Sequence, residues 1–353
     1  MQLSHGRPVG SISFDETNLV LSAGLVPVMS LAGSAGLAEL ADHHLSVSGD
    51  KGANAGAKVA SLVAGMTAGA DSIDDMAILR HGGMSRIFDS TYAPSTLGSF
   101  LRSFTFGHVR QLDAVASRVL AGLAARTPIV AGIDEVALVD VDDTIVEVHG
   151  YAKQGAGFGY SGVRGLNAVA ATVTTAGTAP VIVATRLRKG STGSPRGAGR
   201  IVADALATVS KLRSADASGM VLLRADAAYF GRPTILPAVR AGAAVSITVR
   251  KTSQVKAAIA AIPEDSWTPI DYPNAVFDQR TGTWVSRAEV AEIAFTAFGS
   301  APAAGQVPGR LVVRRIPDLN PPEDPGQASL FDVWRFHAFF TTSELDGLVK
   351  FFV

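Results

Sequence analysis

The sequence predicts an α/β protein in which a helical N-terminal domain precedes a mixed α/β core. From Leu19 to about Arg126, apolar residues recur at spacings of three and four, which is typical of amphipathic helices. From Thr127 onward, runs of β-branched residues separated by turn residues indicate strands. Several strands followed by a helix, a strand and a second helix indicate a mixed sheet with helices packed on it.

In the N-terminal part, helical stretches are expected with Ser, Asp or Gly between them as caps and breaks. They are Ser30–His44, Gly56–Ala70, Asp71–His81, Ser95–Phe106 and His108–Ala125.

Strands are expected in the core along TPIVAGIDEVALVDVDDTIVEVHG, LNAVAATVTT and APVIVATRL. After a polar loop at Arg186–Arg200, the pattern predicts a helix at Ile201–Arg213, the strand GMVLLRAD and a helix at Pro233–Ala241. Short strands return from about Lys251 to Thr342, and Ile316–Ser329 reads as an exposed Pro-rich loop. The expected domains are therefore residues 1–126, 127–250 and 251–353.

Composition restricts the chemistry. The 353 residues contain no Cys, which excludes disulfides, thiolate zinc sites and cysteine nucleophiles. The seven His form no HxH or HxxxH pair, so an oxygen-ligated ion such as Mg²⁺ (or Mn²⁺) is the metal we expect. Because neither a secretory signal nor a long apolar run is present, we expect a cytoplasmic protein without a membrane partner.

The charge is unevenly distributed although the net charge is zero. Residues 151–260 contain 15 Lys or Arg and 3 Asp or Glu, whereas acidic residues are in excess on both sides. Clustered cations favour a polyanion because phosphate contacts release counterions. A solvated basic face is the alternative explanation.

Two acidic segments are candidates for chemistry. In VALVDVDDT, strand alternation places Asp140 and Asp142 on one face, where two carboxylates require a cation, a hydrogen-bond network or open water. Asp226 follows the apolar run of GMVLLRAD, at the end of a strand where open α/β sheets place functional groups. Capping residues in ordinary turns are the structural alternative for all three.

A basic Gly- and Ser-rich loop, RLRKGSTGSPRGAGR, and the segment YAKQGAGFGYSGVRG offer cationic and stacking surface for DNA. Neither matches a nucleotide-binding loop, because the Gly and Lys of KGST stand in the wrong order and the other glycines open no clear helix. The candidate DNA-binding residues are Lys153, Tyr160, Arg164, Arg186, Arg188, Lys189, Arg196 and Arg200.

A family resemblance rests on longer stretches: DKGANAGAKVASLVAGMTAGADSIDDMAILRHGGM, YAPSTLGSFLRSFTFGHVRQLD, DVDDTIVEVHGYAKQGAGFGYSGVRGLNA, LRADAAYF and AEVAEIAFTAF. Through them the chain resembles the DDE transposases of bacterial insertion sequences, specifically the insertion sequence 1380 group. The resemblance implies a ribonuclease-H-like mixed sheet core with a β-strand-rich insertion, and an N-terminal domain that recognises terminal inverted repeats. It further implies metal-dependent DNA cleavage and strand transfer, with self-association on DNA.

By that resemblance, Asp142 and Asp226 match the first two catalytic, metal-binding carboxylates, and Asp140 matches an accompanying carboxylate without an assigned role. Asp143 stands where the family has a small hydroxyl residue. The third carboxylate of the family, a Glu on a later helix, has no match in SELDGLVKFFV, so we expect a copy that is truncated or frame-shifted near residue 346.

Two other functions are compatible with the sequence. DVDDT also fits the haloacid-dehalogenase-type phosphohydrolase pattern, with Asp140 as nucleophile and Asp142 as acid, although no matching downstream acidic pair follows. A non-catalytic transposase remnant that binds DNA ends is the second alternative.

Overall fold

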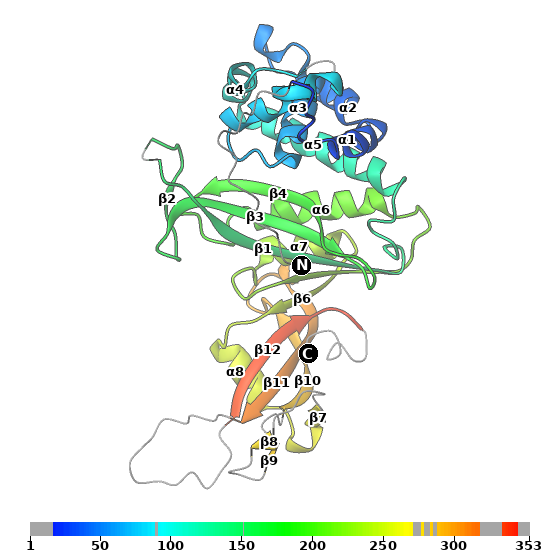
Figure 1. Cartoon of the computed structure of the whole chain (residues 1–353). Coiled ribbons are helices and arrows are strands. Elements are labelled where there is room, and N and C mark those ends of the chain that lie inside the picture. Colours follow the sequence, from blue (N-terminus) through cyan, green and yellow to red (C-terminus); the bar gives the residue numbers. More distant parts are fainter. Residues whose placement is uncertain are drawn as a thin grey trace. The chain divides into compact units, whose positions relative to one another are not determined.

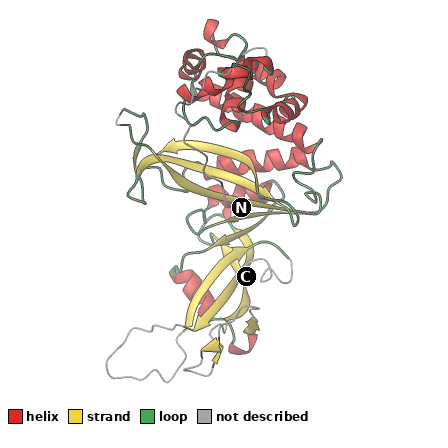
Figure 2. Ribbon diagram, viewed as in Figure 1, coloured by secondary structure: helices red, strands yellow, loops and turns green. Residues whose placement is uncertain are grey.

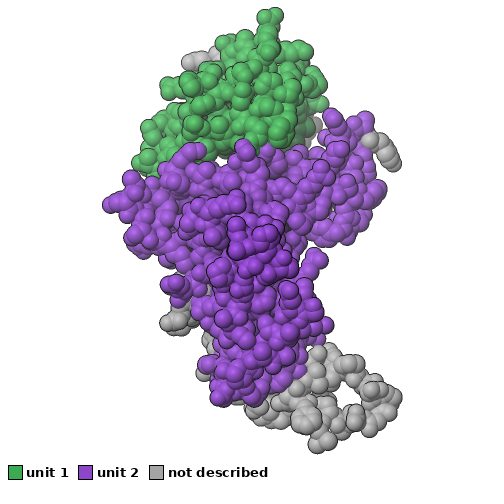
Figure 3. Space-filling view, turned by 180° about the vertical axis from the view of Figure 1, so that it is seen from behind, with its two compact units in different colours: residues 1–128 green, residues 129–353 purple. Residues whose placement is uncertain are grey.

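The computed structural model describes residues 17–88, 91–150, 152–270, 277–278, 283–284, 288–317 and 334–344. The chain forms two compact units, residues 1–128 and residues 129–353 (Figure 3). The described part of the first unit is helical, and the strands belong to the second (Figure 2). Most of the predicted Pro-rich loop and the segment after Glu344 lie outside the described residues.

The first unit contains α-helices joined by short 3₁₀ helices. They are α1 (Leu25–Ser34), α2 (Leu37–His44), η1 (Asp50–Gly52), α3 (Ala55–Thr67), η2 (Asp74–Arg80), η3 (Gly82–Arg86), α4 (Pro94–Arg102) and α5 (Phe106–Ala124). The stretch expected as one helix at Ser30–His44 is interrupted at Gly36, whose φ of 87° is left-handed and ends the preceding helix. Within Asp71–His81, where an α-helix is expected, the structure has the 3₁₀ helix η2 over Asp74–Arg80.

The core of this unit collects the apolar faces of α2, α3, α4 and α5. Ala41, Leu97 and Phe100 are fully buried at its centre. Gly56 allows the backbones of α2 and α3 to approach closely. A Cβ at this position would lie only 2.2 Å from the Ala38 carbonyl oxygen. No single described helix has both the length and the apolar composition to cross a membrane, although the bent pair α1 and α2 reaches them jointly.

The second unit combines strands with three α-helices in its described residues. The strands are β1 (Val136–Glu147), β2 (Gly157–Phe158), β3 (Arg164–Thr174), β4 (Val181–Lys189), β5 (Met220–Ala225), β6 (Ala244–Thr248), β7 (Thr268–Ile270), β8 (Phe277–Asp278), β9 (Thr283–Trp284), β10 (Ala288–Ala297), β11 (Val307–Pro317) and β12 (Trp334–Thr341). The helices are α6 (Ala198–Leu212), α7 (Arg232–Arg240) and α8 (Ser253–Ala260), with 3₁₀ helices η4 (Glu264–Ser266) and η5 (Ala303–Gly305).

Most of these strands form one mixed sheet in the order β2-β3-β1-β5-β6-β12-β11-β10-β7, with β4 also paired to β3 (Figure 1). Strand β1 is antiparallel to β3 and parallel to β5, and β5 is parallel to β6. The later strands β12, β11, β10 and β7 continue the sheet in antiparallel pairs. The residue ranges 127–250 and 251–353 therefore share one sheet.

Alternation along β1 divides its side chains between a buried and an open face. Ala137, Val139 and Val141 are buried on the face that packs with α6, which also contacts β3 and β4. Asp140 and Asp142 point to the opposite face, as alternation predicts.

The expected basic loop is shorter than its sequence suggested: β4 extends through Lys189 and α6 begins at Ala198.

Arg315 on β11 forms a cluster of contacts with residues near β7, β10 and β12. Its guanidinium lies 4.3 Å from the Trp267 ring centroid and 4.4 Å from that of Trp334. It also donates to Glu289 and, through two nitrogens, to Glu264. The Arg315 side chain is only 7% exposed, so these carboxylates and rings replace its lost hydration.

Replacing this arginine should therefore destabilise the fold. We expect Arg315→Ala to lower the free energy of unfolding by about 2 kcal/mol or more, because the buried side chain, its ion pairs with Glu264 and Glu289 and its contacts with two tryptophan rings are all lost. Urea denaturation measures the change. Arg240→Ala, at an exposed position of α7, is the control and should change stability by less than about 0.5 kcal/mol. Equal effects of the two substitutions would contradict this assignment.

Candidate functional site

The parallel pairing of β1 with β5 brings the predicted acidic residues together. Asp140 is opposite Arg224 and Val141 is opposite Ala225 in this register. Asp142 and Asp226 are the residues that directly follow the last pair of this ladder on each chain. The two residues expected to share a metal ion therefore each lie one residue beyond the β1–β5 pairing.

Asp140 has its own cation. Its two carboxylate oxygens accept hydrogen bonds from Nε and Nη2 of Arg224, both at 2.7 Å. This bidentate pair crosses from β1 to β5, and both side chains are partly buried. The predicted accompanying carboxylate is therefore neutralised within the sheet.

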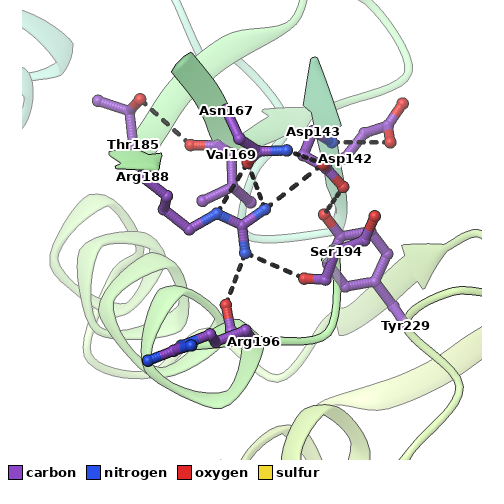
Figure 4. A network of polar contacts seen from close by, with 9 residues as sticks. All are labelled: Asp142, Asp143, Asn167, Val169, Thr185, Arg188, Ser194, Arg196 and Tyr229. Carbon is purple, nitrogen blue, oxygen red and sulfur yellow. Dashed lines mark hydrogen bonds and ion pairs between the residues drawn. The ribbon is translucent and has the colours of Figure 1, made fainter. Parts of the chain in front are cut away.

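Asp143 has a different cation on the opposite face of β1. Arg188 Nη2 lies 3.4 Å from its Oδ2, and the two side chains are 9% and 3% exposed. Tyr229 donates to Oδ1 at 2.5 Å, and Asn167 donates to Oδ2. Figure 4 shows Asp143 enclosed by these side chains and by Ser194.

The same cluster uses the hydrogen-bonding capacity of Arg188. Its Nε and Nη2 donate to Oδ1 of Asn167 at 2.8 and 2.5 Å. Its Nη1 donates to the backbone oxygens of Ser194 and Arg196 at 3.1 and 2.6 Å. Arg188 therefore ties β3, β4 and the loop before α6 to the buried carboxylate.

The cluster also fixes the protonation states of its members. Burial raises the pKa of Asp143, but hydrogen bonds from Tyr229, Ser194 and Asn167, with the charge of Arg188, bring that pKa below its usual value. Burial and the bond to Asp143 raise the pKa of Tyr229 far above its usual value. Asp143 is thus a charged acceptor and Tyr229 a protonated donor at neutral pH.

Asp142 and Asp226 differ from these compensated carboxylates. Both are exposed, and within the described residues no Lys or Arg forms an ion pair with either. Asp142 Oδ1 accepts from the Asp143 backbone N–H at 2.8 Å, and Asp226 Oδ1 accepts from the Ala228 N–H at 2.9 Å. Two like charges next to the end of the same pair of strands repel each other, and a cation would relieve that repulsion.

This arrangement fits a divalent ion of the expected kind. No group of three or more His, Asp or Glu side chains in the described chain is placed to hold a metal. Mg²⁺ usually keeps several waters and is bound by one or two carboxylates together with substrate phosphates. Asp142 and Asp226 match that two-carboxylate pattern.

The predicted DNA-binding residues fall into two groups. Lys153, Lys189 and Arg196 are exposed, and Tyr160 and the Arg200 side chain are 81% and 69% exposed. Arg200 also pairs with Asp204, at 3.2 Å. The other three are engaged within the chain: Arg186 pairs with Asp204, Arg164 donates to the Val148 and Gly150 carbonyls, and Arg188 belongs to the buried cluster.

The roles of Asp143, Asn167 and Tyr229 were not predicted from the sequence. A signal was present for two of them: Asp143 shares strand parity with buried Val139 and Val141, and Asn167 shares it with Val169 on β3. Polar residues on a buried strand face require partners. Tyr229 lies after a strand, where parity gives no guide.

No protein-family model matches the chain, and no curated protein shows significant similarity to it.

Substituting Arg188 and Arg196 tests whether the buried arginine has a structural role that the exposed arginine lacks. Arg188→Ala should lower the free energy of unfolding by about 3 kcal/mol, because Asp143 would remain buried without its cation. Arg196→Ala should change it by less than about 0.5 kcal/mol, since its exposed side chain can be replaced while its backbone oxygen remains. Chemical denaturation of both variants measures these values, and a stable Arg188→Ala protein would refute the structural role.

Proposed function

We propose that this chain is a DNA transposase of the DDE class, which cleaves and joins phosphodiesters at the ends of a mobile element. The observation that supports it most is the selective compensation of charge where the pairing of β1 with β5 ends. Asp140 and Asp143 each have an arginine, whereas the neighbouring Asp142 and Asp226 have none among the described residues. A carboxylate pair without protein cations is suited to bind Mg²⁺ or Mn²⁺.

The strand arrangement supports a ribonuclease-H-like core. In the order β4-β3-β1-β5-β6, the first three strands are antiparallel, and β5 and β6 run parallel to β1. Helices α6 and α7 connect β4 to β5 and β5 to β6. This topology, with Asp142 on β1 and Asp226 directly after β5, agrees with the sequence resemblance. Strands β7 and β10–β12 fall in residues 251–353, the range expected to contain the strand-rich insertion and the last core strand.

The chain's own residues have defined tasks in this proposal. Asp142 and Asp226 would hold the ion, and Arg224 neutralises Asp140 so that Asp140 adds no unbalanced charge beside them. A bound divalent ion would activate a water or 3′-hydroxyl and stabilise the leaving oxygen. Cleavage adds water across a phosphodiester to leave a 3′-hydroxyl and a 5′-phosphate, and joining exchanges one phosphodiester for another.

DNA is the proposed partner, both as terminal inverted repeats and as target. Exposed Lys153, Lys189, Arg196 and Arg200 can contact phosphates. Exposed Tyr160 offers a ring for stacking.

The alternatives are less well supported. A phosphohydrolase would require Asp140 as a free nucleophile, yet both of its oxygens accept hydrogen bonds from Arg224. A non-catalytic remnant would bind DNA through the same basic residues as an active transposase. The two hypotheses differ only in whether the chain cleaves DNA, so binding and cleavage have to be measured on the same preparation.

Metal binding tests the proposal at its acidic pair. We expect the native chain to bind Mn²⁺, and Asp142→Asn and Asp226→Asn each to weaken that binding at least about tenfold, because a direct ligand is lost. Asp216→Asn, at an exposed loop position, is the matched control and should leave the affinity unchanged. Calorimetric titration measures the affinities, and equal affinities for all four proteins would rule the pair out as the metal site.

DNA binding tests the basic surface. The affinity for a mixed-sequence duplex should fall as salt rises, with a slope that decreases by about 0.9 for each phosphate contact removed. We expect Lys189→Ala and Arg196→Ala to reduce the slope, whereas Lys256→Ala, exposed on α8, should not. A slope that is the same in all three variants would contradict the assigned surface.

A further inference from the structure

We propose that Tyr229 and Asp143 are positioning residues that fix the spacing between Asp142 and Asp226. The inference rests on the proposed function, because it concerns the affinity of that carboxylate pair for a divalent ion. It assigns a role to two residues that neither contact the ion nor belong to the pair.

The need for such a link follows from where the backbone pairing ends. The β1–β5 ladder ends at Val141 and Ala225, one residue before each carboxylate. Beyond that point the sheet hydrogen bonds no longer hold the two chains at a fixed separation. The distance between Asp142 and Asp226 therefore depends on contacts made further along each chain.

Tyr229 belongs to the same turn as Asp226. Its backbone N–H donates to the Asp226 carbonyl at 3.1 Å, and the Ala228 N–H donates to Asp226 Oδ1 at 2.9 Å. These bonds make residues 226–229 a compact turn in which the tyrosine ring and the carboxylate have a defined relation.

Asp143 is joined to Asp142 in a similar way on β1. The Asp143 N–H donates to Asp142 Oδ1 at 2.8 Å. The 2.5 Å bond from the Tyr229 hydroxyl to Asp143 Oδ1 then connects the two acidic segments beyond the end of the ladder.

Burial makes this connection rigid. Tyr229 is 1% exposed and the Asp143 side chain 3% exposed, so water does not compete for the bond. Asn167 and Arg188 hold the second oxygen of Asp143, which fixes the carboxylate as an acceptor.

A purely structural tyrosine would make a different prediction. Phenylalanine fills nearly the same volume, so Tyr229→Phe preserves the packing and removes only the hydroxyl that links the two segments. Ser194→Ala removes another hydroxyl that bonds to Asp143, but Ser194 lies in the loop before α6, outside the 226–229 turn. The two variants separate the link from a general disturbance of Asp143.

The experiment measures Mn²⁺ affinity of the full chain from the electron paramagnetic resonance signal of free Mn²⁺, together with the thermal midpoint in metal-free buffer. We expect Tyr229→Phe to bind Mn²⁺ about tenfold more weakly, the lower end of the range for residues that orient metal ligands. Two control variants are Ser194→Ala and Tyr92→Phe, the latter in the first unit. Their Mn²⁺ affinities, measured in the same way, should stay within about twofold of the native affinity.

The possible outcomes are distinct. Equal loss in Tyr229→Phe and Ser194→Ala, or no loss in Tyr229→Phe, overturns the positioning role while leaving the metal pair intact. Absence of Mn²⁺ binding by the native chain overturns the proposed function and this inference together. If Tyr229→Phe unfolds at the assay temperature, the affinity is measured at a lower temperature where its midpoint shows it folded, with the native chain alongside.

Discussion

The parallel register between β1 and β5 is the constraint on which the candidate site depends. It places Asp140 opposite Arg224, and Asp142 and Asp226 directly follow its last backbone pair. A shift by one residue would reverse the face of each side chain and separate the Asp140–Arg224 ion pair. The buried Val139, Val141, Leu222 and Leu223 fix this register by packing on both strands.

The four aspartates near the end of the β1–β5 pairing fall into two classes: two are paired with arginines, and two are exposed without such a partner among the described residues. Asp140 and Asp143 are neutralised by arginines from β5 and β4, and Asp143 is further held by a tyrosine and an asparagine. Removing a charge from water without a partner is costly, so the buried Asp143 requires its cation. Asp142 and Asp226 are exposed, and the mutual repulsion of the two charges is the electrostatic condition that favours a divalent ion.

The parts of this arrangement that depend on local pattern could be predicted from the sequence. The alternation in VALVDVDDT placed Asp140 and Asp142 on one face, and the apolar run before Asp226 indicated a central strand. The burial of the Arg188 side chain and its pairing with Asp143 could not be predicted. Its cluster joins residues 143, 167, 188, 194 and 229, and one sequence contains no signal for such distant pairing. The helix break at Gly36 likewise depends on a left-handed backbone that periodicity does not reveal.

The central claim is that Asp142 and Asp226 bind one divalent ion between them. Anomalous diffraction from crystals of the full chain soaked in Mn²⁺ tests it most directly. The account predicts an anomalous peak within about 2.5 Å of a carboxylate oxygen of each residue. A map with Mn²⁺ bound elsewhere on the chain and none between these two aspartates would contradict it.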